Sequence, residues 1–186
     1  MARKSKPAAE VISSRMAFHG AVFNVTSDDV IEPGGVKVRR DVVRHAGSVV
    51  ILAVDETEKE PRVLLERQYR YATGDFLWEL PAGRVDEGES ELAGAKRELM
   101  EETGYTARSW KRALFFYSSP GFLDETMAIY LARDLTMGKP QPEEDERITT
   151  RMFPLSDLVR KVLSGGLRDS KTIVGVLWLA QAGILQ

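Results

Sequence analysis

The side chains best suited to chemistry are the carboxylates that follow Gly83. Glu98, Glu101 and Glu102 stand close together in the chain, and Glu89 precedes them. At about 100° per residue, the three neighbouring glutamates fall on one face of an α-helix. Like charges four residues apart destabilise a bare helix, whereas a hard divalent cation takes oxygen ligands and removes that repulsion. The spacing therefore indicates a helix face that binds metal.

A single helix must position these carboxylates. The sequence predicts it over Glu91–Thr103, with Ser90 as the N-cap and Gly104 as the C-terminal stop. Arg97 stands four residues before Glu101, so we expect the two side chains to pair. This pairing would hold the Glu101 carboxylate in position.

An acidic helix face is more often a solvated surface without a function. The residues before the helix argue against that interpretation here. Leu80-Pro81-Ala82-Gly83 ends a strand and bends into a loop, and Glu89 faces back toward the start of the helix. A solvated face needs no such lead-in, so we expect a site where the loop meets the helix.

The rest of the chain reads as strands with a few helices. Glu32-Pro33-Gly34-Gly35 predicts a turn between the first two strands. Strands are expected over 17–25, 36–43, 48–54, 62–71, 76–80, 113–117 and 126–132 and near 152–153, and further helices over 156–164 and 170–182. Because strands and helices do not alternate regularly, the pattern predicts an α+β fold. Residues 1–15 are expected to form a flexible tail, and 16–186 a single domain.

Composition excludes several other classes of protein. The chain has 186 residues, of which 43% are apolar and 29% charged, as in an ordinary globular protein. A net charge of -2 offers no basic face for nucleic acid, and no run approaches the roughly 18 apolar residues of a membrane span. The chain has no cysteine, which excludes disulfides and permits a reducing cytoplasm, where we expect the protein to act.

The carboxylates belong to a longer pattern with fixed spacing. Its fixed positions are Gly83, Glu89, Arg97-Glu98-Leu99, Glu101-Glu102, Gly104 and Tyr105. This pattern resembles the catalytic box of the Nudix hydrolases at every position. The resemblance implies a mixed β-sheet sandwiched between helices (α/β/α), here with an N-terminal β-hairpin appendage over 17–43. It also implies hydrolysis of a nucleoside diphosphate linked to another group, with Mg²⁺ or Mn²⁺ as the cofactor.

The resemblance assigns roles to the residues of the box. Glu98, Glu102 and the carbonyl group of Ala82 would be the principal metal ligands. Glu101 would bind a further metal or orient water, and Glu89 would assist by hydrogen bonding. The metals would bridge the pyrophosphate oxygens, neutralise developing charge and lower the pKa of the attacking water.

Further segments are similar to the ADP-ribose and sugar-nucleotide pyrophosphatases of this family. They are Glu66-Arg67-Gln68-Tyr69-Arg70, Trp78 to Gly83, and Ser118-Ser119-Pro120-Gly121-Phe122 with Glu125. The predicted reaction is ADP-ribose plus water to AMP and ribose 5-phosphate. A GDP-mannose or other ADP-sugar pyrophosphatase is the alternative. A sensor that binds ADP-ribose without cleaving it is a more remote alternative, which the intact box disfavours.

Each candidate substrate residue has a competing interpretation. A guanidinium suits bidentate binding of phosphate, so Arg70 is a candidate for that role, or else forms a surface ion pair. Glu79 is expected either in the pocket or in a structural hydrogen bond. Pro120 and Gly121 line the substrate site or merely form a turn. Glu125 beside them is a candidate acceptor for a ribose hydroxyl group.

Two expectations concern catalysis and assembly. The acidic loop 143–146 reads as solvated from its charge alone, but the resemblance implies that a glutamate in this region is the general base. Glu146 is the first choice and Glu144 the second. The expected partner is a small nucleotide sugar, with neither nucleic acid nor a membrane. A homodimer is also expected, formed through the N-terminal strands 17–43.

Overall fold

The computed structural model describes residues 8–139 and 148–182. The chain divides into two compact units, where the sequence predicted one domain over 16–186. Unit 1 comprises Met1–Gly47 and Tyr117–Thr126, and unit 2 comprises Ser48–Phe116 and Met127–Gln186. Glu144 and Glu146, the two candidates for the general base, lie outside the described residues.

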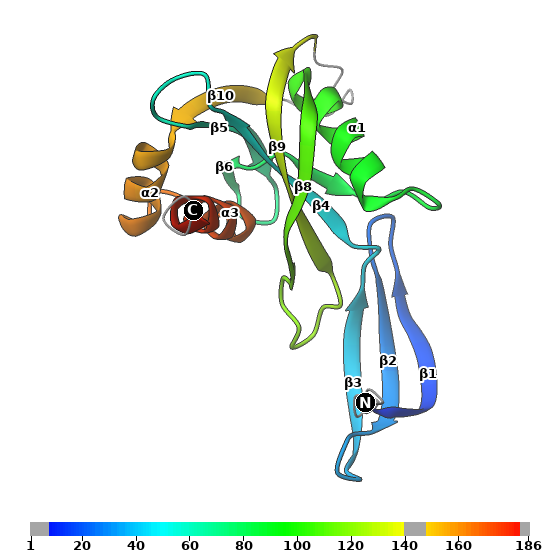
Figure 1. Ribbon diagram of the computed structural model, residues 1–186. Helices are drawn as coiled ribbons and strands as arrows, with labels where there is room; N and C mark the ends of the chain where they lie inside the picture. The colour runs from blue at the N-terminus through cyan, green and yellow to red at the C-terminus, as the bar shows by residue number, and fades with distance from the viewer. Residues whose placement is uncertain (1–7, 140–147, 183–186) are drawn as a thin grey trace, which may run out of the picture. The chain divides into compact units, whose positions relative to one another are not determined.

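Unit 1 is built on a three-stranded antiparallel sheet with the order β1-β2-β3 (Figure 1). The strands are β1 (Glu10–His19), β2 (Asn24–Ile31) and β3 (Lys37–Arg44). The turn between β2 and β3 has two glycines with positive φ, Gly34 at 107° and Gly35 at 86°. The turn predicted over residues 32–35 is therefore confirmed, since only glycine adopts this backbone without strain.

The predicted two-stranded hairpin is wrong, because the sheet has a third strand. Residues 10–15, expected in the flexible tail, belong to β1, and the predicted strand 17–25 divides between β1 and β2. All residues of β1 are exposed, so they show no alternation of buried and exposed side chains. Cross-strand hydrogen bonds hold this strand instead, such as Ser14 Oγ to Asp28 Oδ1 at 2.6 Å.

Unit 2 is built on a mixed sheet with the order β10-β5-β4-β9-β8, to which β6 adds beside β5 and β7 beside β4. Its strands are β4 (Ser48–Asp55), β5 (Arg62–Arg70), β6 (Asp75–Glu79), β7 (Ala82–Arg84), β8 (Tyr105–Tyr117), β9 (Thr126–Met137) and β10 (Thr149–Pro154). The central strand β4 pairs with β9 in parallel and with β5 and β7 antiparallel. This strand is buried throughout its middle, as its continuous apolar run predicted.

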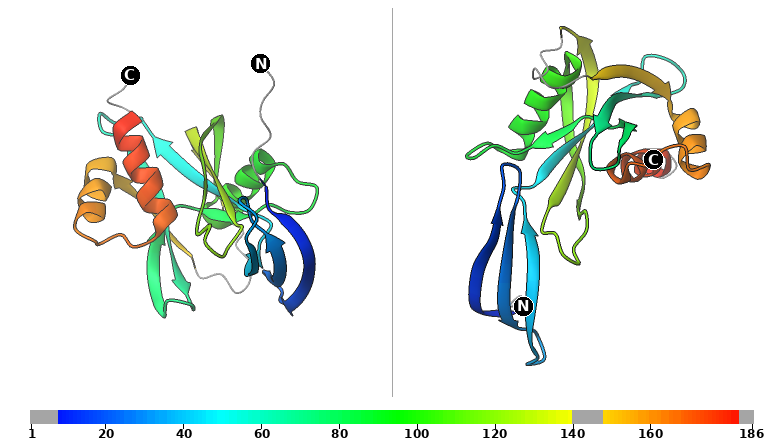
Figure 2. Two further views of the ribbon diagram at one scale, coloured as in Figure 1. Left: turned by 90° about the horizontal axis from the view of Figure 1, so that it is seen from below. Right: turned by 180° about the vertical axis from the view of Figure 1, so that it is seen from behind.

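Helices cover both faces of this sheet (Figure 2). Helix α1 (Glu91–Thr103) packs on one face, and α2 (Leu155–Leu163) and α3 (Ser170–Ala182) pack on the other. Alternate residues of β4 supply the two cores: Ile51 lies in the cluster that contains Leu99 of α1, and Leu52 in the cluster that contains Val176 of α3. Burying each such side chain contributes roughly 1.5–3 kcal/mol. The predicted α/β/α sandwich is confirmed.

The predicted boundaries hold best for the helices. Those of α1 and α3 agree with the sequence, and α2 begins one residue earlier. Strand β8 is much longer than the predicted 113–117. The sequence did not indicate the first half of the strand, because the residues there are largely exposed and form no apolar run. No helix in the described part of the chain is long and apolar enough to cross a membrane.

Candidate active site

The loop and helix that carry the carboxylates are fixed by local signals. Ser90 Oγ accepts a hydrogen bond from the backbone N–H of Ala93 at 3.2 Å, which caps α1. Gly104 ends the helix in the left-handed region, with φ at 75°, and its N–H donates to the carbonyl of Met100. Both ends of the helix therefore form as the sequence predicts.

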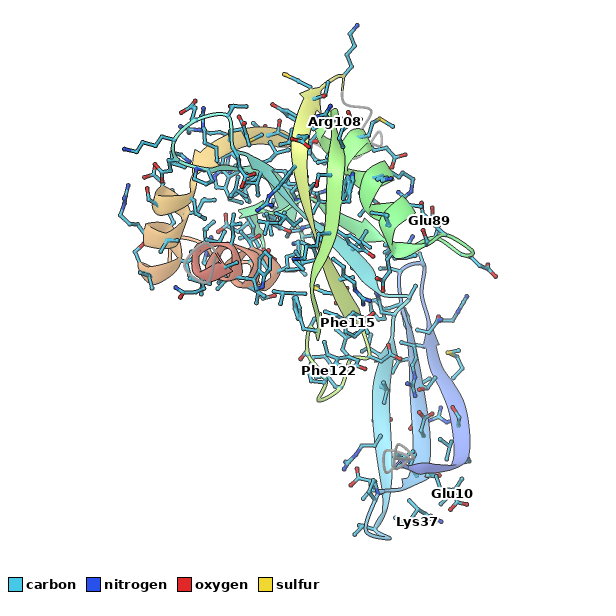
Figure 3. All side chains as sticks on the ribbon, viewed as in Figure 1. Glu10, Lys37, Glu89, Arg108, Phe115 and Phe122 are labelled. Atoms are coloured by element: carbon cyan, nitrogen blue, oxygen red, sulfur yellow. The ribbon has the colours of Figure 1, made fainter. Side chains whose placement is uncertain are left out.

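Arg97 lies at the centre of the acidic face. Its Nη1 donates to Glu98 Oε1 at 2.7 Å and to Glu101 Oε2 at 3.1 Å. Its Nε and Nη2 donate to Glu89 at 3.2 and 3.0 Å (Glu89 is labelled in Figure 3). The predicted pair with Glu101 is confirmed, and the guanidinium binds two more carboxylates besides.

The charges within this cluster stabilise one another. Hydrogen bonding from Arg97 holds the pKa of Glu89 below its ordinary value. Hydrogen bonding to Glu89, then to Glu98 and Glu101, raises the pKa of Arg97 above its ordinary value despite partial burial. The arginine is therefore positively charged at neutral pH and brings three carboxylates together.

Two close contacts join the strand β7 to the helix. The buried carboxylate of Glu102 accepts a hydrogen bond from the backbone N–H of Ala82, at 3.1 Å to Oε2. A Cβ atom on Gly83 would lie 1.9 Å from Glu98 Oε1, which no side chain tolerates. A side chain at position 83 would therefore displace the Glu98 carboxylate, because strand β7 and this carboxylate approach so closely.

Strand β7 and helix α1 enclose a polar pocket of about 230 Å³. Its lining residues are Ala82, Gly83, Arg84, Asp86, Arg97, Glu98, Glu101 and Glu102. Carboxylate and carbonyl oxygens are the donors that Mg²⁺ and Mn²⁺ prefer, so the residues present fit such an ion. The described residues hold no group of three His, Asp or Glu side chains already arranged around one point. Arg97 instead takes hydrogen-bonding positions on Glu89, Glu98 and Glu101.

Arg70 and Glu79, two candidate substrate residues, bind each other. Arg70 donates from Nε and Nη2 to the two oxygens of Glu79, each at 2.9 Å. Burial opposes the charge on Glu79, but hydrogen bonding from Arg70 and the charge of Lys171 outweigh it and lower the Glu79 pKa. The structural alternative for Glu79 is thus satisfied, and Lys171 is a member of this cluster that the sequence did not indicate.

Glu66 is a second residue that the sequence did not single out. It is fully buried, and burial raises its pKa to about 7, against opposing effects of Glu102 and Lys171. Neither of its oxygens has a hydrogen-bonding partner of normal geometry in the described ranges. A buried carboxyl group therefore lies within interaction distance of Glu102.

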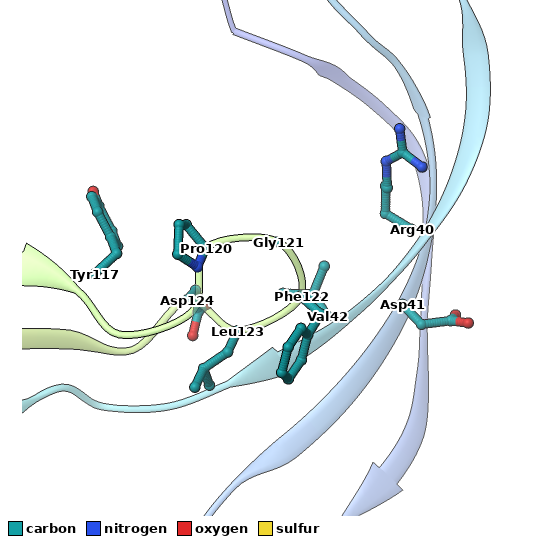
Figure 4. A pocket seen from close by; sticks show the side chains of 9 residues that line it. All are labelled: Arg40, Asp41, Val42, Tyr117, Pro120, Gly121, Phe122, Leu123 and Asp124. Carbon is teal, nitrogen blue, oxygen red and sulfur yellow. The ribbon is translucent and has the colours of Figure 1, made fainter. Parts of the chain in front are cut away.

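The remaining substrate candidates belong to unit 1. Pro120 and Gly121 line a cavity of about 340 Å³ together with Tyr117 and Phe122 (Figure 4). The backbone N–H of Phe122 donates to the carbonyl of Ser119 at 3.3 Å, so these residues do form a turn. Glu125 accepts a hydrogen bond from Ser118 Oγ at 2.9 Å. These three candidates are described with unit 1, and the box glutamates with unit 2.

Comparison with known proteins agrees with this geometry. The model of the NUDIX domain matches residues 44–173, which is more than half of the chain, and the chain therefore belongs to the NUDIX family. Nudix hydrolases generally need divalent metal ions. The oxygen donors of the pocket between β7 and α1 are suited to that requirement.

Two curated relatives cover almost the whole chain. An ADP-ribose pyrophosphatase of Mycobacterium tuberculosis is 41% identical over 171 residues, which are 90% of this chain and 81% of the relative. An ADP-ribose pyrophosphatase of Bacillus subtilis is 34% identical over 179 residues, or 95% of both chains. A solved structure titled "ADP compounds hydrolase" superimposes with a TM-score of 0.78 at 22% identity and covers 96% of both chains, which shows a shared fold.

Proposed function

We propose that this chain is a Mg²⁺-dependent ADP-ribose pyrophosphatase that converts ADP-ribose and water to AMP and ribose 5-phosphate. The observation that carries the proposal is the cluster of carboxylates around Arg97, beside the Ala82–Gly83 backbone. Two relatives of similar length named ADP-ribose pyrophosphatase support the choice of substrate.

The metal would be held by Glu98, Glu102 and the carbonyl group of Ala82. Glu101 would bind a further ion or orient the attacking water. When bound, the metal supplies positive charge that neutralises the pyrophosphate oxygens and acidifies water. Mn²⁺ should replace Mg²⁺, since both take oxygen ligands.

The chain's own residues have the task of holding these ligands in place. Arg97 binds the carboxylates of Glu89, Glu98 and Glu101, and so limits their rotation. The Ala82 N–H holds one oxygen of Glu102. The carboxylates are therefore partly ordered before a cation binds, which lowers the entropic cost, although they must still turn toward a common point.

Contacts to the substrate are proposed residue by residue from the resemblance. The part of the Arg70 guanidinium that does not bind Glu79 would bind a phosphate group, since a guanidinium suits that geometry. Glu125 would accept a hydrogen bond from a ribose hydroxyl, and Pro120 and Gly121 would contact the sugar or the base.

Glu146, or else Glu144, is proposed as the general base on the resemblance alone. Glu146→Gln should lower kcat by about 10²–10⁴-fold, the usual range for lost acid–base catalysis, with KM changed far less. Glu143→Gln is the matched control and should have almost no effect. A large loss in Glu144→Gln instead would transfer the role to that residue, and a loss below tenfold in all three would end the proposal.

A homodimer in the cytoplasm completes the proposal. Strand β1 lies at an edge of its sheet and exposes Val11, Ile12, Met16 and Phe18, which a second copy would cover. Light scattering should give twice the mass of one chain, and a monomer at working concentration would refute the dimer. Cell fractionation tests the location.

A panel of nucleotide sugars with Mg²⁺ tests the proposed substrate. We expect kcat/KM for ADP-ribose to exceed that for GDP-mannose and ADP-glucose by at least about tenfold, which corresponds to a difference of 1.4 kcal/mol in transition-state binding. A higher value for GDP-mannose would overturn the substrate while leaving the reaction class in place.

A further inference from the structure

The ends of β5 and β6 meet the start of α3 in a cluster of four charged side chains, which are Arg70, Glu79, Asp169 and Lys171. Glu79 accepts both hydrogen bonds of the Arg70 fork, and Lys171 Nζ donates to the same carboxylate. Lys171 also donates to Asp169 Oδ1 at 3.1 Å. The side chains of Lys171 and Glu79 are only 9% and 2% exposed. A carboxylate held between two cations in this way has one orientation.

The start of α3 is itself fixed to the end of β6. Asp169 Oδ2 accepts hydrogen bonds from the N–H and the hydroxyl of Thr172, at 2.9 and 2.6 Å. The Thr172 hydroxyl oxygen then accepts from the backbone N–H of Leu80 at 2.7 Å. A Cβ atom on Gly175 would lie 2.6 Å from Leu80, so the helix packs directly against this residue.

Successive residues from Glu79 to Ala82 are thus held by different elements. Lys171 and Thr172 of α3 bind Glu79 and Leu80, respectively. The carbonyl of the next residue, Pro81, accepts from Ile51 N–H of β4, and the N–H of Ala82 donates to Glu102. Helix α3 therefore helps to hold in place the segment that leads into the carboxylate pocket.

We propose that Lys171 is a positioning residue for Arg70: through Glu79, it fixes the Arg70 guanidinium so that its free edge faces a phosphate of the substrate. This inference rests on the proposed function, because it assumes a substrate with a pyrophosphate group. It assigns no contact between Lys171 and the substrate.

The geometry of Arg70 supports this role. The fork to Glu79 uses Nε and Nη2, so the N–H groups of Nη1 take no part in it. The side chain is 38% exposed, which leaves part of it accessible to a ligand. The negative charges of Glu79, Glu66 and Glu102 all act to raise the pKa of Arg70.

Stability alone is a poor explanation for these buried charges. Replacing a buried ion pair with well-packed apolar residues is often neutral or stabilising, because desolvation offsets the attraction between the charges. Lys171 contacts Arg70 only through the shared carboxylate of Glu79 among the hydrogen bonds described here. A role in orienting Arg70 accounts for a lysine at the start of a largely apolar helix.

A double-mutant cycle between Lys171→Met and Arg70→Met tests the inference directly. Lys171→Met should raise KM for ADP-ribose about tenfold or more with kcat changed less than threefold, as expected when binding is lost uniformly. The double variant should be no worse than Arg70→Met alone, because Lys171 acts through Arg70. Lys171→Arg keeps the positive charge, so its KM for ADP-ribose should stay close to the wild-type value. Lys161→Met removes an exposed lysine and is the matched control. Additive effects, or an unchanged KM in Lys171→Met, would overturn the inference.

A second readout does not depend on activity. Hydrogen exchange of the Arg70 Nε–H, followed by ¹⁵N NMR, should be at least about tenfold faster in Lys171→Met than in the wild type if the fork loosens. If Lys171→Met fails to fold, Lys171→Gln is used in both measurements, since it keeps a donor but loses the charge. Wild-type protein without activity on ADP-ribose would refute the proposed function, whereas unchanged exchange at Arg70 would refute the role of Lys171.

Discussion

Two charged clusters in unit 2 differ in how far apart their residues are in the chain and in how deeply they are buried. The first cluster surrounds Arg97 and joins residues from Arg84 to Glu101, which are close together in the chain and partly exposed. The second surrounds Glu79 and joins β5, β6 and α3; its hydrogen-bonded partners are up to 92 residues apart in the chain, and its side chains are mostly buried. The first cluster carries the candidate metal ligands, whereas the second holds the Arg70 side chain in one orientation.

The difference in burial has an energetic consequence. Partly exposed ion pairs contribute little to stability, typically about 0–1 kcal/mol, because water and salt screen them. Breaking a buried pair by removing one partner costs much more, since it leaves an unpaired charge in the core. Substitutions in the first cluster should therefore affect activity, and those in the second should affect stability as well.

The largest effect is expected for the metal ligands. Glu98→Gln and Glu102→Gln should each lower kcat by about 10³-fold, which is the upper range for losing a preorganised electrostatic group. The proteins should remain folded, as circular dichroism and thermal melting would establish. Full activity in both variants would remove the carboxylate helix from the mechanism.

The next prediction compares the loss of stability and of activity when Lys171 or Arg97, the cations of the two clusters, is replaced. Lys171→Met should lower the free energy of unfolding by about 1.5–3 kcal/mol, because Glu79 loses one charged hydrogen-bond donor in a buried site but keeps the Arg70 fork. Arg97→Met should lower it by about 1 kcal/mol or less, yet reduce activity by roughly 10–100-fold through misplaced ligands. Urea denaturation and steady-state kinetics on both variants measure these quantities. Equal losses of stability would erase the distinction between the clusters.

Gly83→Ala should lower stability less than Lys171→Met and should disturb only the cluster around Arg97. The added methyl group would meet the Glu98 carboxylate, which must then move. This displacement should cost about 1 kcal/mol, the low end for overpacking, because only the end of a flexible side chain has to move. Gly166→Ala is the matched control, since a Cβ atom there would come no closer than 3.4 Å to its neighbours. Unaltered kinetics in Gly83→Ala would show that Glu98 can leave its present position without loss.

The smallest effect is a difference in acid sensitivity. The pKa values of Glu79 and Glu89 both lie below the ordinary value of 4.5 in the folded state. Each carboxylate therefore stabilises the fold above that pH, and the contribution is lost as pH falls through the lowered pKa. Salt at 0.5 M should weaken the contribution of Glu89 but not that of buried Glu79. Melting curves of Glu79→Gln and Glu89→Gln between about pH 2 and 6 test this, and equal salt dependence would contradict it.

The first cluster was predictable from sequence because its determinants are local. The N-cap Ser90, the terminal Gly104 and the spacing of Arg97 and Glu101 all act within a few residues of one another. The same holds for the alternating environment of β4, whose apolar run marks a strand buried on both faces.

Neither the cluster around Glu79 nor strand β1 could be predicted from the sequence, because neither leaves a local pattern in it. Lys171 finds Glu79 only after the sheet and α3 have packed, so no local pattern marks it. Strand β1 is held by polar contacts to β2, and its exposed residues have no periodicity to read. For Arg70 and Glu79 the sequence left two roles open, and their mutual fork favours a structural role for Glu79.

Metal dependence of the reaction tests the role of the carboxylate pocket most directly. AMP released from ADP-ribose is measured after EDTA treatment and again during titration with Mg²⁺. We expect no release in EDTA and full recovery with Mg²⁺, whereas Glu98→Gln should recover only about a thousandth of the wild-type rate under the same conditions. Release of AMP that continues undiminished in EDTA would contradict this role of the pocket.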